Sequence, residues 1–258
     1  MMAVMIKVTR INALLEILRT SPRRIHKIIL QKEGERRPVG EIVALAKAGH
    51  VPYLFVPRAA LDKLAPHHQG VVAMLAPREF ATLESILEGA GPAPFLVLLD
   101  EVEDPQNLGA ILRSAECAGS HGIILPERRS AGLTDAVYEV SSGALEHLKV
   151  ARVPNLAQTM AALKERGVWL IGAEGGGSGR FYEFDYRQPV GIVMGSEGKG
   201  LRPLIRERCD RILSIPMAGK INSLNVASAA SVFFFEVLRQ RLQSGDDALV
   251  HPPGGRRT

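Results

Sequence analysis

Two loops near the C-terminal end of the sequence carry the residues best suited to hold a small molecule. Gly195 to Gly200 follows Val190 to Met194, an apolar run whose length suits a buried strand. Pro216 to Asn225 leads into a long helical pattern, and Ser223 and Asn225 place short polar side chains where a helix begins with free N–H groups. Glycine lets a backbone approach a ligand closely, although simple turn geometry explains the glycines of the first loop equally well.

Known nucleotide-binding and metal-binding patterns do not match the sequence. The loop at Gly195 lacks the spacing of a phosphate-binding loop, and no Gly-x-Gly-x-x-Gly opens a helix after a strand. The run Gly175 to Gly179 precedes no helical pattern, so we expect a flexible loop there. His67 and His68 point to opposite faces of an extended segment and have no cysteine or carboxylate cluster beside them, which favours a turn over a metal site.

The composition predicts a two-domain cytoplasmic protein. The chain has 258 residues and 46% hydrophobic content, enough to bury one large core or two modest ones. Cys117 and Cys209 are too few for a disulfide framework, so we expect two buried thiols in a reducing compartment. The sequence shows no secretory leader pattern and no span of about 18 apolar residues, so we expect a soluble protein without membrane contact.

Positive charge is concentrated in the N-terminal third. Residues 1–80 contain 13 Lys and Arg against 6 Asp and Glu, whereas residues 81–258 contain 19 against 21. A basic field on one small domain suits a polyanion such as RNA. A solvated basic face without a partner is the alternative.

Asn107 to Ala115, Gly195 to Gly200 and Ser223 to Ala227 form three ordered motifs. Together they resemble the motifs of the TrmH-type ribose methyltransferases of the SPOUT class. Each motif is weak alone, but their order and spacing behind a basic domain are specific. The resemblance covers nearly the whole chain and is closest to bacterial enzymes that methylate a guanosine ribose in large-subunit rRNA. The segments that carry this closer likeness are His68 to Val72, Asp104 and Pro105, Ala131 to Thr134, and Gly143 to His147.

The resemblance implies methyl transfer from S-adenosyl-L-methionine to the ribose 2′-hydroxyl of a guanosine in 23S rRNA, by a homodimer formed through the C-terminal domain. It places seven residues around the cofactor: Gly195, Ser196, Gly200, Ile215, Met217, Leu224 and Ala227. It places five in catalysis: Arg113, Asn107, Glu197, Ser223 and Asn225. A bulky side chain at Gly195 is therefore expected to block the cofactor and leave the fold largely intact. Without the resemblance, Arg113 would be expected in a surface ion pair and Glu197 would be an ordinary loop carboxylate.

The fold class is α/β with two domains. Residues 1–80 alternate two helical segments with three strand-like segments and predict a small α/β domain that binds RNA, which the resemblance likens to ribosomal proteins. The helical segments are Arg10 to Arg19 and Val39 to Ala48, and the strand-like segments are Ile25 to Leu30, Tyr53 to Val56 and Val71 to Leu75. Residues 81–94 contain a short helical segment and then a run rich in glycine and proline from Gly89 to Pro94, which predicts a linker. Residues 95–243 contain continuously apolar strands separated by helices, which predicts a parallel sheet covered on both faces. The resemblance adds a deep trefoil knot, which pattern reasoning alone would not predict.

The last helical pattern, Val226 to Leu242, contains three consecutive aromatic residues, Phe233 to Phe235. Successive helical residues point about 100° apart, so at least one ring must face a second surface. A subunit interface and a buried core position explain this equally well. Residues 244–258 have few apolar residues and are expected to be a disordered tail.

Other functions fit parts of the sequence. A tRNA ribose methyltransferase and a resistance-type enzyme that modifies another rRNA nucleotide share the same motifs. A non-catalytic RNA-binding assembly factor on a degenerate scaffold is the alternative from another class. Degeneration should erase Arg113, Glu197 or Asn225, and all three are present.

Overall fold

The computed structural model describes residues 5–32 and 37–243. The expected tail at residues 244–258 lies outside the described residues. The chain forms two compact units. The first comprises Met1–Phe80, Asp104–Arg113 and Ala131–Leu148, and the second comprises Ala81–Glu103, Ser114–Ser130 and Lys149–Thr258.

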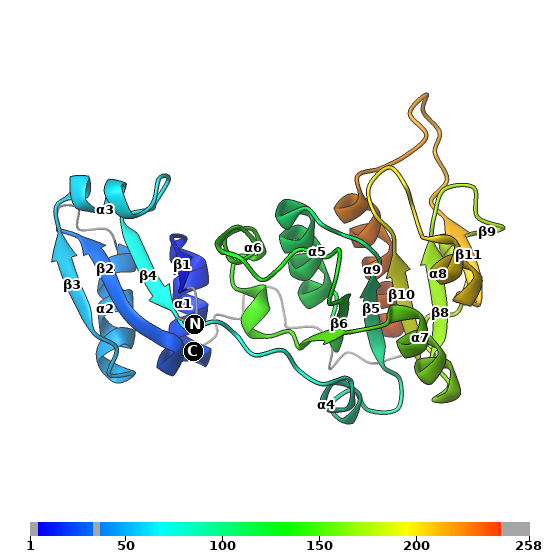
Figure 1. The fold of residues 1–258 in the computed structure, drawn as a ribbon, viewed down its shortest axis with the longest axis horizontal. Helices are drawn as coiled ribbons and strands as arrows, with labels where there is room; N and C mark the ends of the chain where they lie inside the picture. The colour runs from blue at the N-terminus through cyan, green and yellow to red at the C-terminus, as the bar shows by residue number, and fades with distance from the viewer. Residues whose placement is uncertain (1–4, 33–36, 244–258) are drawn as a thin grey trace. The chain divides into compact units, whose positions relative to one another are not determined.

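The first unit is built on a four-stranded sheet in the order β1-β4-β2-β3 (Figure 1). Its strands are β1 (Ile6–Val8), β2 (Ile25–Gln31), β3 (Tyr53–Val56) and β4 (Val71–Leu75). Strand β4 pairs antiparallel with β1 and β2, whereas β3 pairs parallel with β2 at the edge. The helices before residue 80 are α1 (Ile11–Thr20), α2 (Arg37–Ala48) and α3 (Arg58–Leu64). The sequence predicts three of these strands and the first two helices.

Two later helical segments belong to the same unit. They are α6 (Asp135–Ser141) and the 3-10 turn η2 (Ala144–Glu146). Arg24 joins them to the sheet, because its guanidinium donates to the carboxylate of Glu146 at 2.8 Å and to the Tyr138 hydroxyl at 2.6 Å. The Glu146 side chain is only 1% exposed. The first unit is therefore larger than the domain 1–80 that the sequence suggests.

The second unit contains a seven-stranded sheet in the order β7-β6-β5-β10-β8-β11-β9, in which every pairing is parallel. Its strands are β5 (Phe95–Leu99), β6 (Gly122–Pro126), β7 (Val150–Val153), β8 (Trp169–Ala173), β9 (Gly179–Arg180), β10 (Val190–Met194) and β11 (Arg211–Ser214). Strands β5, β6 and β10 are buried throughout, as expected for a sheet covered on both faces. The predicted parallel sheet is confirmed.

Helices cover the two faces of this sheet. One buried cluster joins α4 (Leu83–Glu88), α7 (Leu156–Glu165) and α8 (Pro203–Arg208) to strands β5 to β8. On the other face, Phe234 of α9 (Val226–Gln243) stacks edge-on against Phe95, with ring centroids 5.7 Å apart. Phe233 and Phe234 are buried, but Phe235 is 48% exposed. The prediction that one ring faces away from the core is confirmed.

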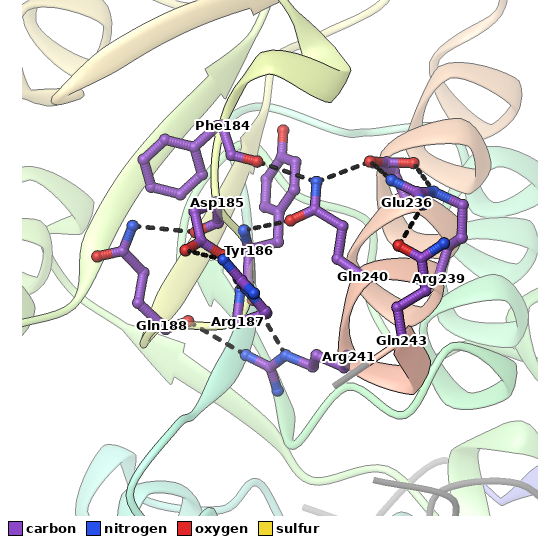
Figure 2. A network of polar contacts seen from close by, with 10 residues as sticks. All are labelled: Phe184, Asp185, Tyr186, Arg187, Gln188, Glu236, Arg239, Gln240, Arg241 and Gln243. Atoms are coloured by element: carbon purple, nitrogen blue, oxygen red, sulfur yellow. Dashed lines mark hydrogen bonds and ion pairs between the residues drawn. The ribbon is translucent and has the colours of Figure 1, made fainter. Parts of the chain in front are cut away.

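A polar network holds the second half of α9 in place (Figure 2). The side chain of Gln240 accepts from the Tyr186 backbone N–H at 2.9 Å and donates to the Phe184 carbonyl at 3.0 Å. Arg241 donates to the carbonyls of Tyr186 and Gln188. Glu236 completes the network by pairing with Arg239 at 2.8 Å. Since all these bonds involve the segment just before β10 or α9 itself, they fix the helix beside the centre of the sheet.

The two cysteines differ in environment. Cys209 is half-buried, and burial raises the pKa of its thiol to about 12. Cys117, at the end of helix α5 (Pro105–Cys117), is exposed, so the expectation of a buried thiol is wrong there. Of the helices in the described ranges, none is both long and apolar enough to cross a membrane.

Candidate active site

The loop after β10 is a tight turn that closes on itself. Ser196 and Gly200 form an antiparallel bridge, with backbone N···O distances of 3.1 and 3.0 Å. A Cβ at Gly195 would lie 2.2 Å from the carbonyl carbon of Gly200. No such contact is tolerated, so glycine at 195 is required by the turn itself. A bulky residue at 195 would therefore force the loop open, in addition to the block on cofactor binding that the sequence predicts.

The second loop ends at the start of α9. The Asn225 side-chain oxygen accepts from the backbone N–H of Ala227 at 2.9 Å and of Ser228 at 3.4 Å. This is the arrangement of a helix N-cap, which the sequence predicts at this position. Ser223 and Leu224 just before it are exposed.

The two loops line one cavity of about 840 Å³. It lies where three neighbouring parallel strands end, because residues that follow β8, β10 and β11 all contribute to its wall. Ligands in open α/β sheets bind in this position, beyond the carboxyl ends of the strands. The cavity brings together nine of the predicted site residues: Gly195, Ser196, Glu197, Gly200, Ile215, Met217, Ser223, Leu224 and Asn225.

Ala227, Asn107 and Arg113 do not line this cavity. Ala227 is buried in the first turn of α9. Asn107 is buried and Arg113 is exposed, and both lie on α5 within the first unit. Ser114, the next residue along α5, belongs to the second unit, where its hydroxyl hydrogen-bonds with that of Ser231 on α9 at 2.8 Å.

The cavity is also lined by residues that the sequence patterns do not predict. Glu174 and the backbone of Gly175 and Gly176 line it, although the sequence suggests only a flexible loop there. The Glu174 carboxylate accepts from Arg206 Nε at 2.7 Å and from the Leu201 backbone N–H at 3.3 Å. These bonds join segments that are distant in the sequence. The only local signal is the position of Glu174, directly after an apolar strand.

Phe233 and Met194 add apolar groups to the lining, and Lys199 adds a cationic one. Phe233 comes from α9, two turns after the N-cap, and is 1% exposed. The sequence predicts the Phe233 side chain in a core or an interface. It does not predict the cavity, because the sequence of a helix does not show which strand ends the helix faces.

A buried carboxylate anchors the segment that follows the first loop. Asp100, at the end of β5, is fully buried and accepts from the Arg202 backbone N–H at 2.9 Å and from Arg202 Nε at 2.8 Å. The hydrogen bond to Asp100 raises the pKa of the Arg202 guanidinium. Arg202, the residue just before α8, is therefore held in a fixed position.

The cavity can hold a ligand with both apolar and charged parts. Met194, Ile215 and Leu224 offer apolar contacts, whereas Glu174, Glu197 and Lys199 carry charge. The glycine-rich loops add backbone N–H and carbonyl groups. About 300–1,000 Å³ is usual for cofactor sites, and this cavity falls within that range.

Comparisons with known proteins agree along most of the sequence. Residues 94–235 match the model of the SpoU rRNA Methylase family, and residues 11–81 match the model for RNA 2′-O ribose methyltransferase substrate binding. YacO of Bacillus subtilis is 41% identical over 239 residues, which are 91% of this chain and 96% of that protein. Its name assigns it provisionally to the TrmH family of tRNA/rRNA methyltransferases. A Staphylococcus saprophyticus protein with the same assignment is 41% identical over 88% of this chain and 93% of its own.

Solved structures share the fold. The SpoU methyltransferase AviRb from Streptomyces viridochromogenes, in complex with the cofactor AdoMet, is 26% identical, with a TM-score of 0.78 over 92% of this chain and 90% of that one. An AdoMet-bound rRNA methyltransferase from Sinorhizobium meliloti is 25% identical, with a TM-score of 0.76 over 91% and 87%. A structure described for 2′-OH methylation of C/U34 on tRNA is 27% identical, with a TM-score of 0.54, and matches 59% of this chain and 99% of its own.

Proposed function

Because this chain belongs to the SpoU (TrmH) family of RNA 2′-O-ribose methyltransferases, we propose that it methylates the ribose 2′-hydroxyl of a guanosine in large-subunit rRNA. The observation that carries this proposal is the single cavity formed by the two motif loops at the strand ends. We place the reaction in the cytoplasm, where bacterial rRNA is found.

S-adenosyl-L-methionine is the cofactor, and the cavity fits it. An adenine ring needs apolar faces, which Ile215, Leu224 and Phe233 supply. Its edge needs backbone hydrogen-bonding groups, which the turns at Gly195 and Leu224 present. The charged methionine part needs polar neighbours, which the Ser196 hydroxyl and the Gly200 backbone can supply, and Met217 adds an apolar contact. Ala227 is proposed to lie near the cofactor in the first turn of α9, where it is buried. When bound, the cofactor supplies a methyl group on a sulfonium, which is already a good leaving group.

The chain's own residues must then position and activate a weak nucleophile. Ser223 and Asn225 lie at the cavity wall and start α9, so they are suited to align a ribose hydroxyl. Asn107 contributes from α5, and Glu197 orients the first loop or Arg113. These roles rest on the family motifs.

Arg113 is the proposed catalytic residue. A guanidinium with a pKa above about 12 is a poor base near neutral pH, so charge stabilisation is the favoured role. Arg113 would contact the adjoining phosphate and lower the energy of the alkoxide that develops on the ribose. Its exposed position on α5 leaves the side chain accessible to RNA.

The N-terminal region supports rRNA over tRNA. Residues 11–81 match a substrate-binding model, and residues 1–80 carry the excess of positive charge. The structure described for tRNA methylation matches only 59% of this chain, although it is covered over 99% of its own length. A protein of that kind therefore lacks a counterpart of a large part of this chain. The N-terminal domain is proposed to resemble certain ribosomal proteins.

A homodimer and a knotted backbone complete the proposal. The exposed large apolar side chains of the second unit include Leu204, Met217, Ile221, Leu224 and Phe235. Burial of such surface is the usual reason for subunit association. The knot is proposed from the family resemblance. It would be formed by the C-terminal part of the chain, where β10 lies between β5 and β8 and is followed by α8, β11 and α9.

The test combines cofactor binding with methylation mapping. Calorimetry should show S-adenosyl-L-methionine binding, and 23S rRNA transcribed in vitro should gain a ribose methyl group at a guanosine. A total tRNA pool, assayed alongside, should remain unmodified. Methylation of tRNA alone would replace the rRNA substrate with tRNA. Cofactor binding without methylation of either RNA would favour an assembly factor, and absence of binding at millimolar cofactor would refute the cavity assignment.

A further inference from the structure

A second cavity, of about 470 Å³, lies within the first unit. Its wall is mostly polar and includes Arg10, Asn12, Gln69, Gln106 and Glu139. Asn12 and Gln69 fall in the segment matched to the substrate-binding model, whereas Gln106 and Glu139 fall in the segment matched to the methylase model. Segments matched to both family models therefore contribute to this one cavity.

Two contacts fix the shape of this cavity. Arg10 pairs with Glu139, with Nη2 and Nε at 2.7 and 2.8 Å from the same carboxylate oxygen. The Gln69 side-chain oxygen accepts from the Ile11 backbone N–H at 3.0 Å, which directs its amide nitrogen away from the helix. The Arg10 and Glu139 side chains remain 43% and 35% exposed, so each keeps a face open to a ligand.

The cavity is held against the motif helix α5. Gly109 allows α5 to approach α6 closely, since a Cβ there would lie 2.6 Å from Val140 Cβ. Val140 lines the cavity, and Gln106, one turn before Gly109, lines it from α5. The cavity therefore adjoins the first turn of α5, the helix that carries Asn107 and Arg113.

We propose that this cavity receives the edge of an unpaired nucleobase of the RNA substrate. The inference rests on the proposed RNA methyltransferase function. A phosphate would meet Glu139, whose carboxylate neutralises Arg10 and repels anions. A base edge instead offers adjacent donors and acceptors. The carboxamides of Asn12 and Gln106 each present one donor group beside one acceptor, which is the pattern that pairs bidentately with a base. Gln69, whose oxygen already accepts from Ile11, adds a donor.

The test compares full-length variants on 23S rRNA transcribed in vitro. Asn12→Ala and Gln106→Ala should each raise KM for the RNA about 5- to 150-fold, the range for loss of one bidentate base contact. Cofactor affinity should stay at the wild-type value. The slope of RNA affinity against salt concentration should also be unchanged, because no phosphate contact is lost. Gln158→Ala, which removes an exposed carboxamide from α7, is the control and should match the wild type.

A charge swap separates base reading from a purely structural tie. The double variant Arg10→Glu with Glu139→Arg keeps the ion pair but exchanges the positions of donor and acceptor. We expect the swap to preserve the melting temperature and to leave KM for the RNA raised. A swap variant with the wild-type KM for the RNA would overturn the proposal. So would Asn12→Ala and Gln106→Ala variants whose KM for the RNA equals that of Gln158→Ala. Since wild-type methylation is measured first in the same assay, these results are distinct from failure of the proposed function.

Discussion

Asp100 is a buried carboxylate whose effect on stability depends on one partner residue. Arg202 satisfies it through both its backbone N–H and its guanidinium. Loss of one partner would leave an uncompensated charge at the end of β5, which is strongly destabilising. The local sequence around Asp100 does not indicate this pairing, because the two residues are 102 positions apart.

Arg113→Ala should lower the rate of methyl transfer by about 10²- to 10³-fold or more, the usual loss when one group that stabilises developing charge is removed. S-adenosyl-L-methionine binding should persist, because Arg113 does not line the cofactor cavity. Single-turnover assays on unmethylated rRNA measure the rate. Arg166→Ala, an exposed arginine on the second unit, should leave it unchanged.

Arg113→Lys distinguishes two mechanisms. A lysine deprotonates more readily than an arginine, so retained activity with a lower pH optimum would support a general base. Near-total loss would support the fixed guanidinium. An alanine variant that keeps most of its single-turnover rate would remove Arg113 from catalysis altogether.

Glu236→Gln should weaken the fold in a pH-dependent way. The hydrogen bond from Arg239 lowers the pKa of Glu236 below its usual 4.5, with Gln240 adding to the effect against the opposing influence of burial. Because the folded state favours the ionised form, its stabilisation is present above pH 4.5 and is lost as pH falls through the folded pKa. Urea unfolding at neutral pH and near pH 3 would measure this. Equal differences between wild type and variant at both values would contradict it.

Strands and long helices were predictable from the sequence because their apolar patterns are local. Val190 to Met194 and Tyr53 to Val56 match the observed strands residue for residue. By contrast, β1, α3 and α8 have three to seven residues and were not predicted. Elements this short carry too little periodicity, and tertiary pairing decides them. The cavity wall at Glu174 and Phe233 was missed for the same reason, since it is formed by packing between distant segments.

Gly195→Ala should disturb the loop after β10 before any ligand is considered. Its Cβ would clash with backbone of Gly200 and Leu201, at 2.2 to 2.5 Å. We expect a loss of about 1–3 kcal/mol in unfolding free energy, typical of overpacking, together with weaker cofactor binding. Gly175→Ala is the control, because its Cβ would meet no atom within 4 Å although it lines the same cavity. Thermal unfolding and calorimetry would measure both effects, and a fully stable Gly195→Ala that binds normally would disprove the steric argument.

Residues that are far apart in the sequence pack together in the first unit, and this limits the use of deletion variants. Glu146 and Tyr138 are buried against Arg24. A deletion of residues 1–80 would leave these groups without their partner, so its effect on RNA binding would be mixed with damage to α6. Single substitutions in the full-length chain are the better tools for substrate recognition.

Phe235→Arg should convert the proposed dimer into a monomer. The ring is 48% exposed on α9, the helix that we propose for the subunit interface, and a buried unpaired guanidinium there would oppose association. Sedimentation equilibrium of both proteins would measure the change. Leu54→Arg places the same charge on a 43% exposed side chain of the first unit and should remain dimeric. A monomeric wild type, or a dimeric Phe235→Arg, would count against this interface.

The position of β10 also has a consequence for synthesis on the ribosome. It lies between β5 and β8, yet it is translated after both of them. Until residue 194 has emerged, β5 and β8 each lack the neighbour that pairs with their inner edge, and those apolar edges are open to wrong pairing. Late insertion of a central strand adds non-local contacts, which slows folding. The nascent chain is therefore most vulnerable to aggregation between completion of β8 and arrival of β10, and chaperone binding is expected to concentrate in that interval.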